Sequence, residues 1–237
     1  MDLKQLNETL NYYVRPQTFP VALKLYRSEG ELPEKARMPV RDLGYQITIC
    51  QGIGMGRRYG WTVAIGKDDQ CCLGGAMAMG FLSELPQGMT ANPENTLELG
   101  KYSHLLIAPI HSATFQPDVV VIYGNSAQAM RLVQSASSGM GQAISSVASG
   151  SMDCGDIVAR TVLSDECHFI LPSGGDRVYG STQDHEVVFT MPLSKAEAVV
   201  QGLENTHKAG FRYPVLTELR HRPQLPPFLD LSKLTQA

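Results

Sequence analysis

The sequence contains few charged residues. Lysine, arginine, aspartate and glutamate together make up 18% of its 237 residues, against about 25% in an average soluble domain. The deficit is concentrated between residues 102 and 152, where Asp118 and Arg131 carry the only formal charges. A disordered chain needs many charges and few apolar residues, so this pattern favours a compact protein with a large buried interior.

Three further absences exclude whole classes of protein. A net charge of −3 and a pI near 6.1 argue against a nucleic-acid binder that works by neutralising phosphates. No window approaches 18 consecutive apolar residues, the length that a membrane span needs. The first five residues, M-D-L-K-Q, lack the charged-then-apolar pattern of a secretory signal. We therefore expect a soluble, cytoplasmic protein that binds neither nucleic acid nor membrane.

The chain also lacks internal repeats and low-complexity linkers. We expect one compact domain over residues 1–219, followed by a tail over residues 220–237 that packs on it. The tail has three prolines in the five residues 223–227, which favours an extended, irregular conformation.

Hydrophobic patterns predict strands and helices that alternate along the chain. Continuous apolar runs at 104–110 and 118–123 are typical of strands buried on both faces. We predict further strands at 20–26, 61–66 and 185–191, and helices at 2–13, 45–58, 72–82 and from about 127. The expected fold is therefore α/β or α+β, with a central mixed β-sheet flanked by helices.

Capping residues predict where two of the helices begin. Ser126 is the expected N-cap of the helix from Ala127, with Met130, Val133 and Ser137 on one face. The last helix should begin at a capping box over residues 194–197 and end at Gly210. Its expected apolar stripe is Ala196, Val199, Val200 and Leu203.

Five cysteines are present: Cys50, Cys71, Cys72, Cys154 and Cys167. An odd number in a cytoplasmic chain argues against structural disulfides. No C-x-x-C pair occurs, so spacing alone indicates neither zinc nor a ferredoxin-type cluster.

The neighbours of three cysteines are more informative than their spacing. Cys50, Cys72 and Cys154 are each followed within two residues by glycine. Glycine lets the backbone approach a ligand and aim N–H groups at sulfur. Cys167 has no such context and is predicted to be a core residue. The alternative is that all five are small buried hydrophobes, as free cysteines often are.

Two other segments have the composition of an anion site. Arg57 and Arg58 follow a glycine-rich stretch at 52–56, which is better explained by tight packing than by phosphate binding. The two arginines could bind an anion through their guanidinium groups or lie on the surface without a ligand. In the segment 173–177, consecutive glycines can form an anion-binding nest, while Asp176 could simply pair with Arg177.

His111 is the best candidate for a general base, because it follows a predicted strand at an edge where sites often lie. The other histidines are scattered, and no G-x-S-x-G motif is present.

The stretch from 102 to 134, Y-S-H-L-L-I-A-P-I-H-S-A-T-F-Q-P-D-V-V-V-I-Y-G-N-S-A-Q-A-M-R-L-V-Q, resembles the prokaryotic DUF169 family. That family has an apolar strand ending in Ala-Pro, then Pro-Asp, a second apolar strand and Asn-x-Ala-Gln-Ala-Met-Arg. The resemblance covers most of residues 15–195. Its other matching positions are F-P-V-A-L-K at 19–24, Cys50, Cys72 with Gly74 and Gly75, Cys154, and G-D-R at 175–177.

The resemblance implies oxygen-sensitive chemistry in anaerobic metabolism, because the family is typical of anaerobic bacteria and archaea. The biochemistry of the family is poorly assigned. The sequence departs from the family pattern at Ser173, where relatives often carry cysteine, and at Cys71, which is an extra cysteine beside Cys72.

The first functional hypothesis combines these cysteines in one metal site. Cys50, Cys72 and Cys154, with Cys71 as a fourth candidate, would hold an iron–sulfur cluster of the 4Fe–4S type, with zinc as the lesser alternative. The protein would then perform electron transfer or cluster-based chemistry on a small molecule. Arg57 and Arg177 would bind a small anion nearby.

The second hypothesis is a metal-free protein or enzyme that binds a small anion. Its pocket would be formed by Gly174, Gly175, Asp176 and Arg177, and the cysteines would be core residues. A third reading is a partner-binding subunit, since a charge-poor body can form an oligomer interface. We expect a homo-oligomer.

Overall fold

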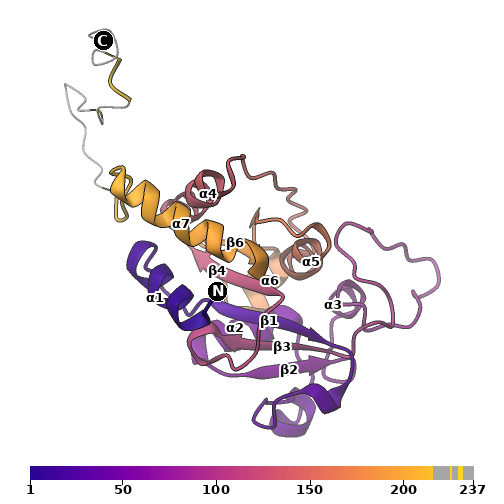
Figure 1. Cartoon of the computed structure of the whole chain (residues 1–237). Coiled ribbons are helices and arrows are strands. Elements are labelled where there is room, and N and C mark those ends of the chain that lie inside the picture. Colours follow the sequence, from indigo (N-terminus) through magenta and orange to yellow (C-terminus); the bar gives the residue numbers. More distant parts are fainter. Residues whose placement is uncertain (216–224, 226–228, 232–237) are drawn as a thin grey trace.

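The structure is built around a six-stranded sheet with helices on both faces (Figure 1). It is a computed structural model that describes residues 1–215, 225 and 229–231. The strands, in the spatial order β2-β3-β1-β4-β6-β5, are β1 Val21–Tyr26, β2 Val63–Gly66, β3 His104–Pro109, β4 Val119–Gly124, β5 His168–Ile170 and β6 Val187–Pro192. The helices are α1 Leu3–Tyr13, α2 Ile49–Tyr59, α3 Leu73–Ala78, α4 Ser126–Met140, α5 Thr161–Ser164, α6 Gly174–Tyr179 and α7 Ala196–Lys208.

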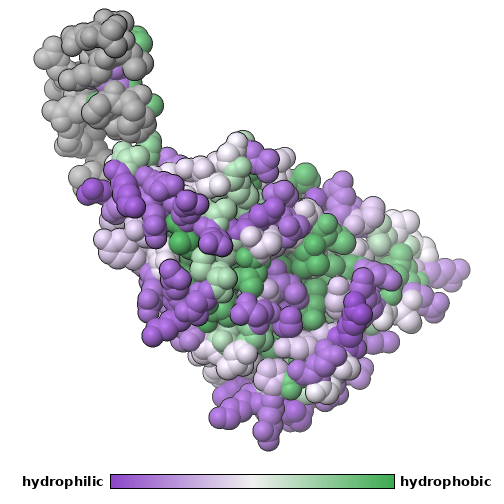
Figure 2. Space-filling view, viewed as in Figure 1, coloured by the Kyte–Doolittle hydropathy of each residue, from purple (hydrophilic) through white to green (hydrophobic). Residues whose placement is uncertain are grey.

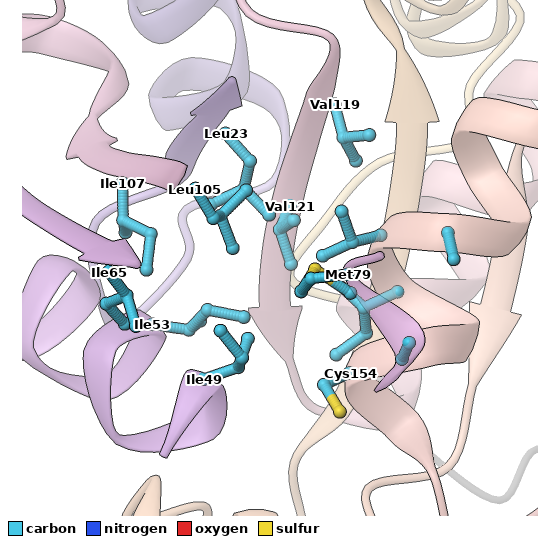
Figure 3. Packing of buried hydrophobic residues seen from close by; sticks show 14 of the residues in the cluster. Leu23, Ile49, Ile53, Ile65, Met79, Leu105, Ile107, Val119, Val121 and Cys154 are labelled. Atoms are coloured by element: carbon cyan, nitrogen blue, oxygen red, sulfur yellow. The ribbon is translucent and has the colours of Figure 1, made fainter. Parts of the chain in front are cut away.

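Alternate residues of each central strand enter two separate hydrophobic clusters. Val21 and Leu23 of β1 pack with α2, α3 and a π-helical turn at Gly155–Arg160. Ala22, between them, packs on the other face with α1, α4 and α7. In Figure 3, Ile49 and Ile53 of α2 lie below the first of these faces. Because successive side chains of a strand point to opposite faces, the helices on both sides exclude water from the middle of the sheet.

The expected α/β class is confirmed: one compact domain has a central sheet flanked by helices. The expectation of a mixed sheet needs correction, because all five strand pairs of the described chain are antiparallel. Parallel pairing is confined to two isolated bridges, Arg37–Val63 and Ile47–Gln70. A continuous apolar run reports burial of both faces and carries no information about strand direction, which explains the difference.

The start of α4 differs by one residue from the sequence prediction. Asn125 is the N-cap, and its side chain accepts hydrogen bonds from the amides of Ala127 and Gln128. The Gln128 side chain accepts from the Asn125 amide in return, at 2.8 Å, which completes a capping box. The buried face also differs, because Met130 is 42% exposed while Leu132 and Ala136 are buried.

The start of α7 is also different from the prediction. Ser194 lies in a 3₁₀ turn before the helix, and its hydroxyl donates to Asp165 at 2.6 Å instead of capping the helix. The predicted apolar stripe is confirmed, because all four of its residues are buried. Gly210 follows the helix with a φ of +100°, the conformation expected just after a helix end.

The surface shows a mosaic of polar and apolar areas (Figure 2). Hydrophilic side chains cover α1 and α7 in this view, and an apolar area lies beside α5. No helix in the described ranges has the length and apolar character that crossing a bilayer requires. The predicted tail at 220–237 lies largely outside the described residues, so it stays a prediction, as does the homo-oligomer.

Small residues in the charge-poor stretch allow α4 and α7 to approach closely. A Cβ atom added to Gly202 of α7 would overlap the backbone carbonyl of Ser135, and one on Gly139 would overlap that of Ala198. The small residues at the end of α4, 135–140, therefore serve a helix–helix contact within the chain.

We predict that Gly202→Ala lowers the free energy of unfolding by about 1–3 kcal/mol. Alanine in a helix is normally favoured over glycine by about 1 kcal/mol, so the backbone overlap has to outweigh this gain. Urea denaturation measures the difference. Gly30→Ala is the control, because a Cβ atom there meets nothing within 4 Å. Equal stability of the two variants would contradict the close helix contact.

Candidate metal centre

Four cysteines from three distant parts of the chain line one pocket of about 470 Å³. Cys50 lies in the first turn of α2, Cys71 and Cys72 directly precede α3, and Cys154 precedes the π-helical turn. The lining residues are Thr48, Cys50, Gln51, Cys71, Cys72, Gly74, Gly75, Ser151, Met152, Asp153, Cys154, Ser173, Gly175 and Tyr179. The structure thus brings together all the cysteines that the sequence singled out as ligands.

Local backbone contacts hold two of these segments side by side. The Thr48 side chain caps α2 by accepting from the Gln51 amide at 3.0 Å. One residue before that cap, the carbonyl of Ile47 accepts from the Cys71 amide, also at 3.0 Å. The entry to α3 is therefore fixed beside the first turn of α2.

All five cysteines are free thiols, but their exposure differs. Cys154 is buried and Cys50 half-buried, while Cys71 and Cys72 are exposed. In Figure 3 the Cys154 sulfur lies at the margin of the aliphatic cluster and is directed away from it. Cys167 packs in the cluster on the other face of the sheet, so its predicted core position is confirmed.

Two buried carboxyl groups lie beside the inner cysteines. The Cys50 Sγ is 4.0 Å from Asp153 Oδ1, and ligand atoms of Cys50, Asp153 and Asp176 all lie within 4.8 Å of one another. Asp153 is 2% and Asp176 1% exposed. Asp153 Oδ2 and Asp176 Oδ1 have no hydrogen-bond donor among the described residues.

The remaining carboxylate oxygens are held by hydroxyl groups. Ser173 donates to Asp153 Oδ1, and its own hydroxyl oxygen accepts from the Asp176 amide. Tyr123 and Thr182 both donate to Asp176 Oδ2, at 3.0 and 2.9 Å. Both carboxyl groups are therefore fixed in position, and one oxygen of each has no hydrogen-bond donor among the described residues.

Burial and mutual repulsion disfavour the negatively charged forms of these groups. Burial, with the charge of Asp153 next, raises the pKa of Asp176 from 3.8 to about 7. Burial also raises the pKa of Asp153. The hydrogen bond with Cys154, followed by burial, raises the pKa of the Cys50 thiol. A proton or a metal cation would relieve this repulsion, so the donor set fits a cation.

Arg57, which the sequence assigned to an anion near the cysteines, is used elsewhere. Its guanidinium forms a two-point ion pair with Glu186, with Nη1–Oε1 at 2.8 Å and Nη2–Oε2 at 3.2 Å. It also lies 3.9 Å from the ring centre of Tyr123. Burial alone would raise the pKa of Glu186, but hydrogen bonds from Arg57 and the Gln183 amide outweigh burial and hold it below its usual range. Arg57 is 1% exposed and does not line the cysteine pocket.

The segment 173–177 is the capped first turn of α6 and not an open anion nest. Gly175 lines the cysteine pocket, while Gly174 does not. Arg177 donates to the Gln183 carbonyl at 2.8 Å and lies 3.9 Å from Asp184, away from the pocket. The expected pairing of Asp176 with Arg177 is replaced by the hydrogen bonds to Tyr123 and Thr182.

The glycines near the cysteines pack against neighbouring elements. Added Cβ atoms would overlap side chains of β2 and β3 at Gly52, the Gln70 amide at Gly75 and the Asn95 carbonyl at Gly155. Gly74 alone of these positions borders a thiol, with its Cβ position 3.9 Å from Cys72 Sγ. The glycine context that drew attention to the cysteines therefore serves close packing.

Asp153, Tyr123 and Glu186 were not identified from the sequence. Asp153 offered one signal, because it ends the charge-poor stretch and directly precedes Cys154. The other two had none, since their partners Asp176 and Arg57 lie 53 and 129 residues away.

The fold and the site define an antiparallel α/β protein with a pocket of free cysteines and buried carboxyl groups. The chain belongs to the DUF169 family, described as uncharacterised ArCR, whose model matches residues 9–202. It is also similar to the uncharacterized protein MJ0308 of Methanocaldococcus jannaschii, with 27% identity over 206 residues that cover 78% of this chain and 86% of that protein. No solved structure matches the chain.

We predict that Asp176→Asn removes a loss of stability at high pH. The raised pKa of Asp176 means that its contribution is fully present below its unfolded value of 3.8 and is lost as the pH rises through about 7. The free energy of unfolding of metal-free wild type should therefore fall by on the order of a few kcal/mol between pH 5 and pH 8, and that of the variant should not show this fall. Urea denaturation in a chelator at both pH values measures this.

The matched control is Asp184→Asn, which neutralises an exposed carboxyl group on the same segment. It should keep the wild-type pH dependence. The same pH dependence in Asp176→Asn and wild type would show that the buried carboxyl pair does not hold the proton.

Proposed function

We propose that this protein binds an iron–sulfur cluster at the cysteine-lined pocket, with Cys50, Cys72 and Cys154 as ligands and Cys71 as the fourth candidate. The observation that carries the proposal is the convergence of these thiols from three distant segments on one pocket. No disulfide uses them. Free cysteines usually behave as buried hydrophobes, so two exposed thiols beside two less exposed ones call for another role.

The chemistry of the donors supports a metal centre. Thiolate ligands select iron–sulfur clusters and zinc over harder cations. The two unpartnered carboxylate oxygens of Asp153 and Asp176 add a local need for positive charge. Ser173, at the position where relatives often carry cysteine, instead donates to Asp153.

The pocket is large enough for a cluster as well as for a single ion. One water occupies about 30 Å³ of liquid, so about 470 Å³ corresponds to roughly fifteen waters. A zinc ion bound by thiolates at about 2.3 Å would fill a small part of that space. A multi-atom cluster, with or without a small substrate, would fill more of the pocket, and zinc is the lesser alternative.

The number of ligands decides what the centre does. With three cysteines, one iron keeps a position for a small molecule, while a fourth thiolate closes the centre and favours electron transfer. Cys71 is exposed at the rim and is the residue on which this choice depends. A cluster accessible from solvent is sensitive to oxygen, which fits the proposed place in anaerobic, cytoplasmic metabolism.

The alternative of a metal-free anion site at Gly174–Arg177 has less support. The Arg177 guanidinium faces the Gln183 carbonyl and Asp184, and the cysteine pocket contains Asp153 with no cationic side chain in its lining. An anion would meet repulsion there.

Protein purified without oxygen should be coloured and contain iron and acid-labile sulfide. Cys50→Ala and Cys154→Ala should lose most of both, because these thiols lie innermost. Cys167→Ala is the control and should keep the full content, since Cys167 lies on the other face of the sheet. A colourless, iron-free protein after anaerobic reconstitution would overturn the proposal.

The rim cysteines need separate variants. Cys72→Ala with full cluster content would remove Cys72 from the ligand set. Cys71→Ala should keep the cluster if the centre has three ligands, and lose it if it has four. Visible absorption with iron and sulfide analysis measures each case.

A further inference from the structure

A second pocket, of about 480 Å³, lies at the other end of α2 and shares no lining residue with the cysteine pocket. It forms where β1 begins and its antiparallel neighbour β3 ends, since Val21 pairs with Pro109. The Phe19 amide donates to the carbonyl of Arg57 at 2.9 Å, which joins the entry to β1 to the last turn of α2. The lining residues are Asn7, Asn11, Pro16, Gln17, Thr18, Phe19, Arg57, Arg58 and His111.

The charge around this pocket is positive. No acidic side chain lines it. Glu186 behind it accepts from both Arg57 and Arg58, and its Oε2 also accepts from the Gln183 amide at 2.7 Å. One carboxylate therefore serves two guanidinium groups, which leaves one positive charge without an ionic partner. Arg58 is the group that reaches solvent, with its side chain 26% exposed.

Three buried polar atoms of the lining residues have no hydrogen-bond partner in the described part of the chain. They are Thr18 Oγ1 and the Nε atoms of Arg57 and Arg58. Asn7 and Asn11 are one turn apart on α1, so their amides face the same side. His111 is exposed and packs on the Phe19 ring with the ring centres 4.8 Å apart.

We propose that this pocket binds a small oxyanion, the carboxylate or phosphate group of a metabolite. Arg58 supplies the charge, His111 and the two asparagine amides supply further hydrogen-bond donors, and Phe19 forms an apolar wall. Guanidinium groups suit carboxylate and phosphate because their donors form a planar fork. The buried Arg57 is a positioning residue, because it fixes Glu186 and through it Arg58. This site is independent of the proposed cluster.

The test is titration calorimetry of the purified full chain with inorganic phosphate and, separately, with malonate. The two titrations distinguish a phosphate-bearing from a carboxylate-bearing ligand. At least one should bind, and Arg58→Gln should weaken it on the order of tenfold or more, the usual effect of losing a charged hydrogen bond. His111→Ala should weaken anion binding as well. Because His111 is exposed, this variant keeps its fold and tests the proposal even if Arg58→Gln fails to fold.

Arg177→Ala is the matched control, because it removes an arginine at the other proposed anion site and should leave binding unchanged. Iron and sulfide content should be the same in Arg58→Gln and wild type, which separates this proposal from the cluster. The proposal is overturned if neither anion binds at millimolar concentration. Equal affinity of wild type, Arg58→Gln and His111→Ala would overturn it too.

Discussion

The buried ion pair between Arg57 and Glu186 fixes the geometry on which both pockets depend. Its side chains are 0% and 4% exposed, and it joins the last turn of α2 to the residue before β6. A buried charge that loses its partner costs about 3–5 kcal/mol, so α2 has one favourable position against the sheet. Cys50 lies seven residues before Arg57, about 10 Å along the helix. The ion pair therefore sets the place of a cysteine that it does not touch.

A continuous series of polar contacts runs from this ion pair to the cysteines. Arg57 lies over the ring of Tyr123, the Tyr123 hydroxyl donates to Asp176, and Asp176 lies beside Asp153 and Cys50. Basic side chains are in excess at one end of the series and acidic side chains at the other. The two proposals accordingly assign opposite ligands to the two pockets, an oxyanion beside Arg58 and a cation beside Asp153.

The sequence predicts the scaffold better than the site. Apolar runs identify β3 and β4, and the spacing of Leu3, Leu6 and Leu10 identifies the buried face of α1, because both signals depend on local periodicity. The site depends on distant partners. Arg57 and Arg58 are adjacent, chemically alike and both at the second pocket, yet Arg57 is buried while Arg58 reaches solvent. Both contact Glu186, 129 and 128 residues away, but only Arg57 forms the two-point ion pair and lies over the Tyr123 ring.

The shortage of charge between residues 102 and 152 reflects the same difference between the scaffold and the site. This stretch supplies β3, β4 and α4, which form the dry middle of the sheet and the close contact with α7. Both of its charged side chains have hydrogen-bond partners: Asp118 accepts from the Leu25 amide, and Arg131 donates to Thr206 and Gln134. Burial lowers the pKa of Arg131, so even this charge is costly there. Apart from His111, the ionisable groups that line the two pockets come from segments outside this stretch, where helices begin or end and side chains from distant segments meet.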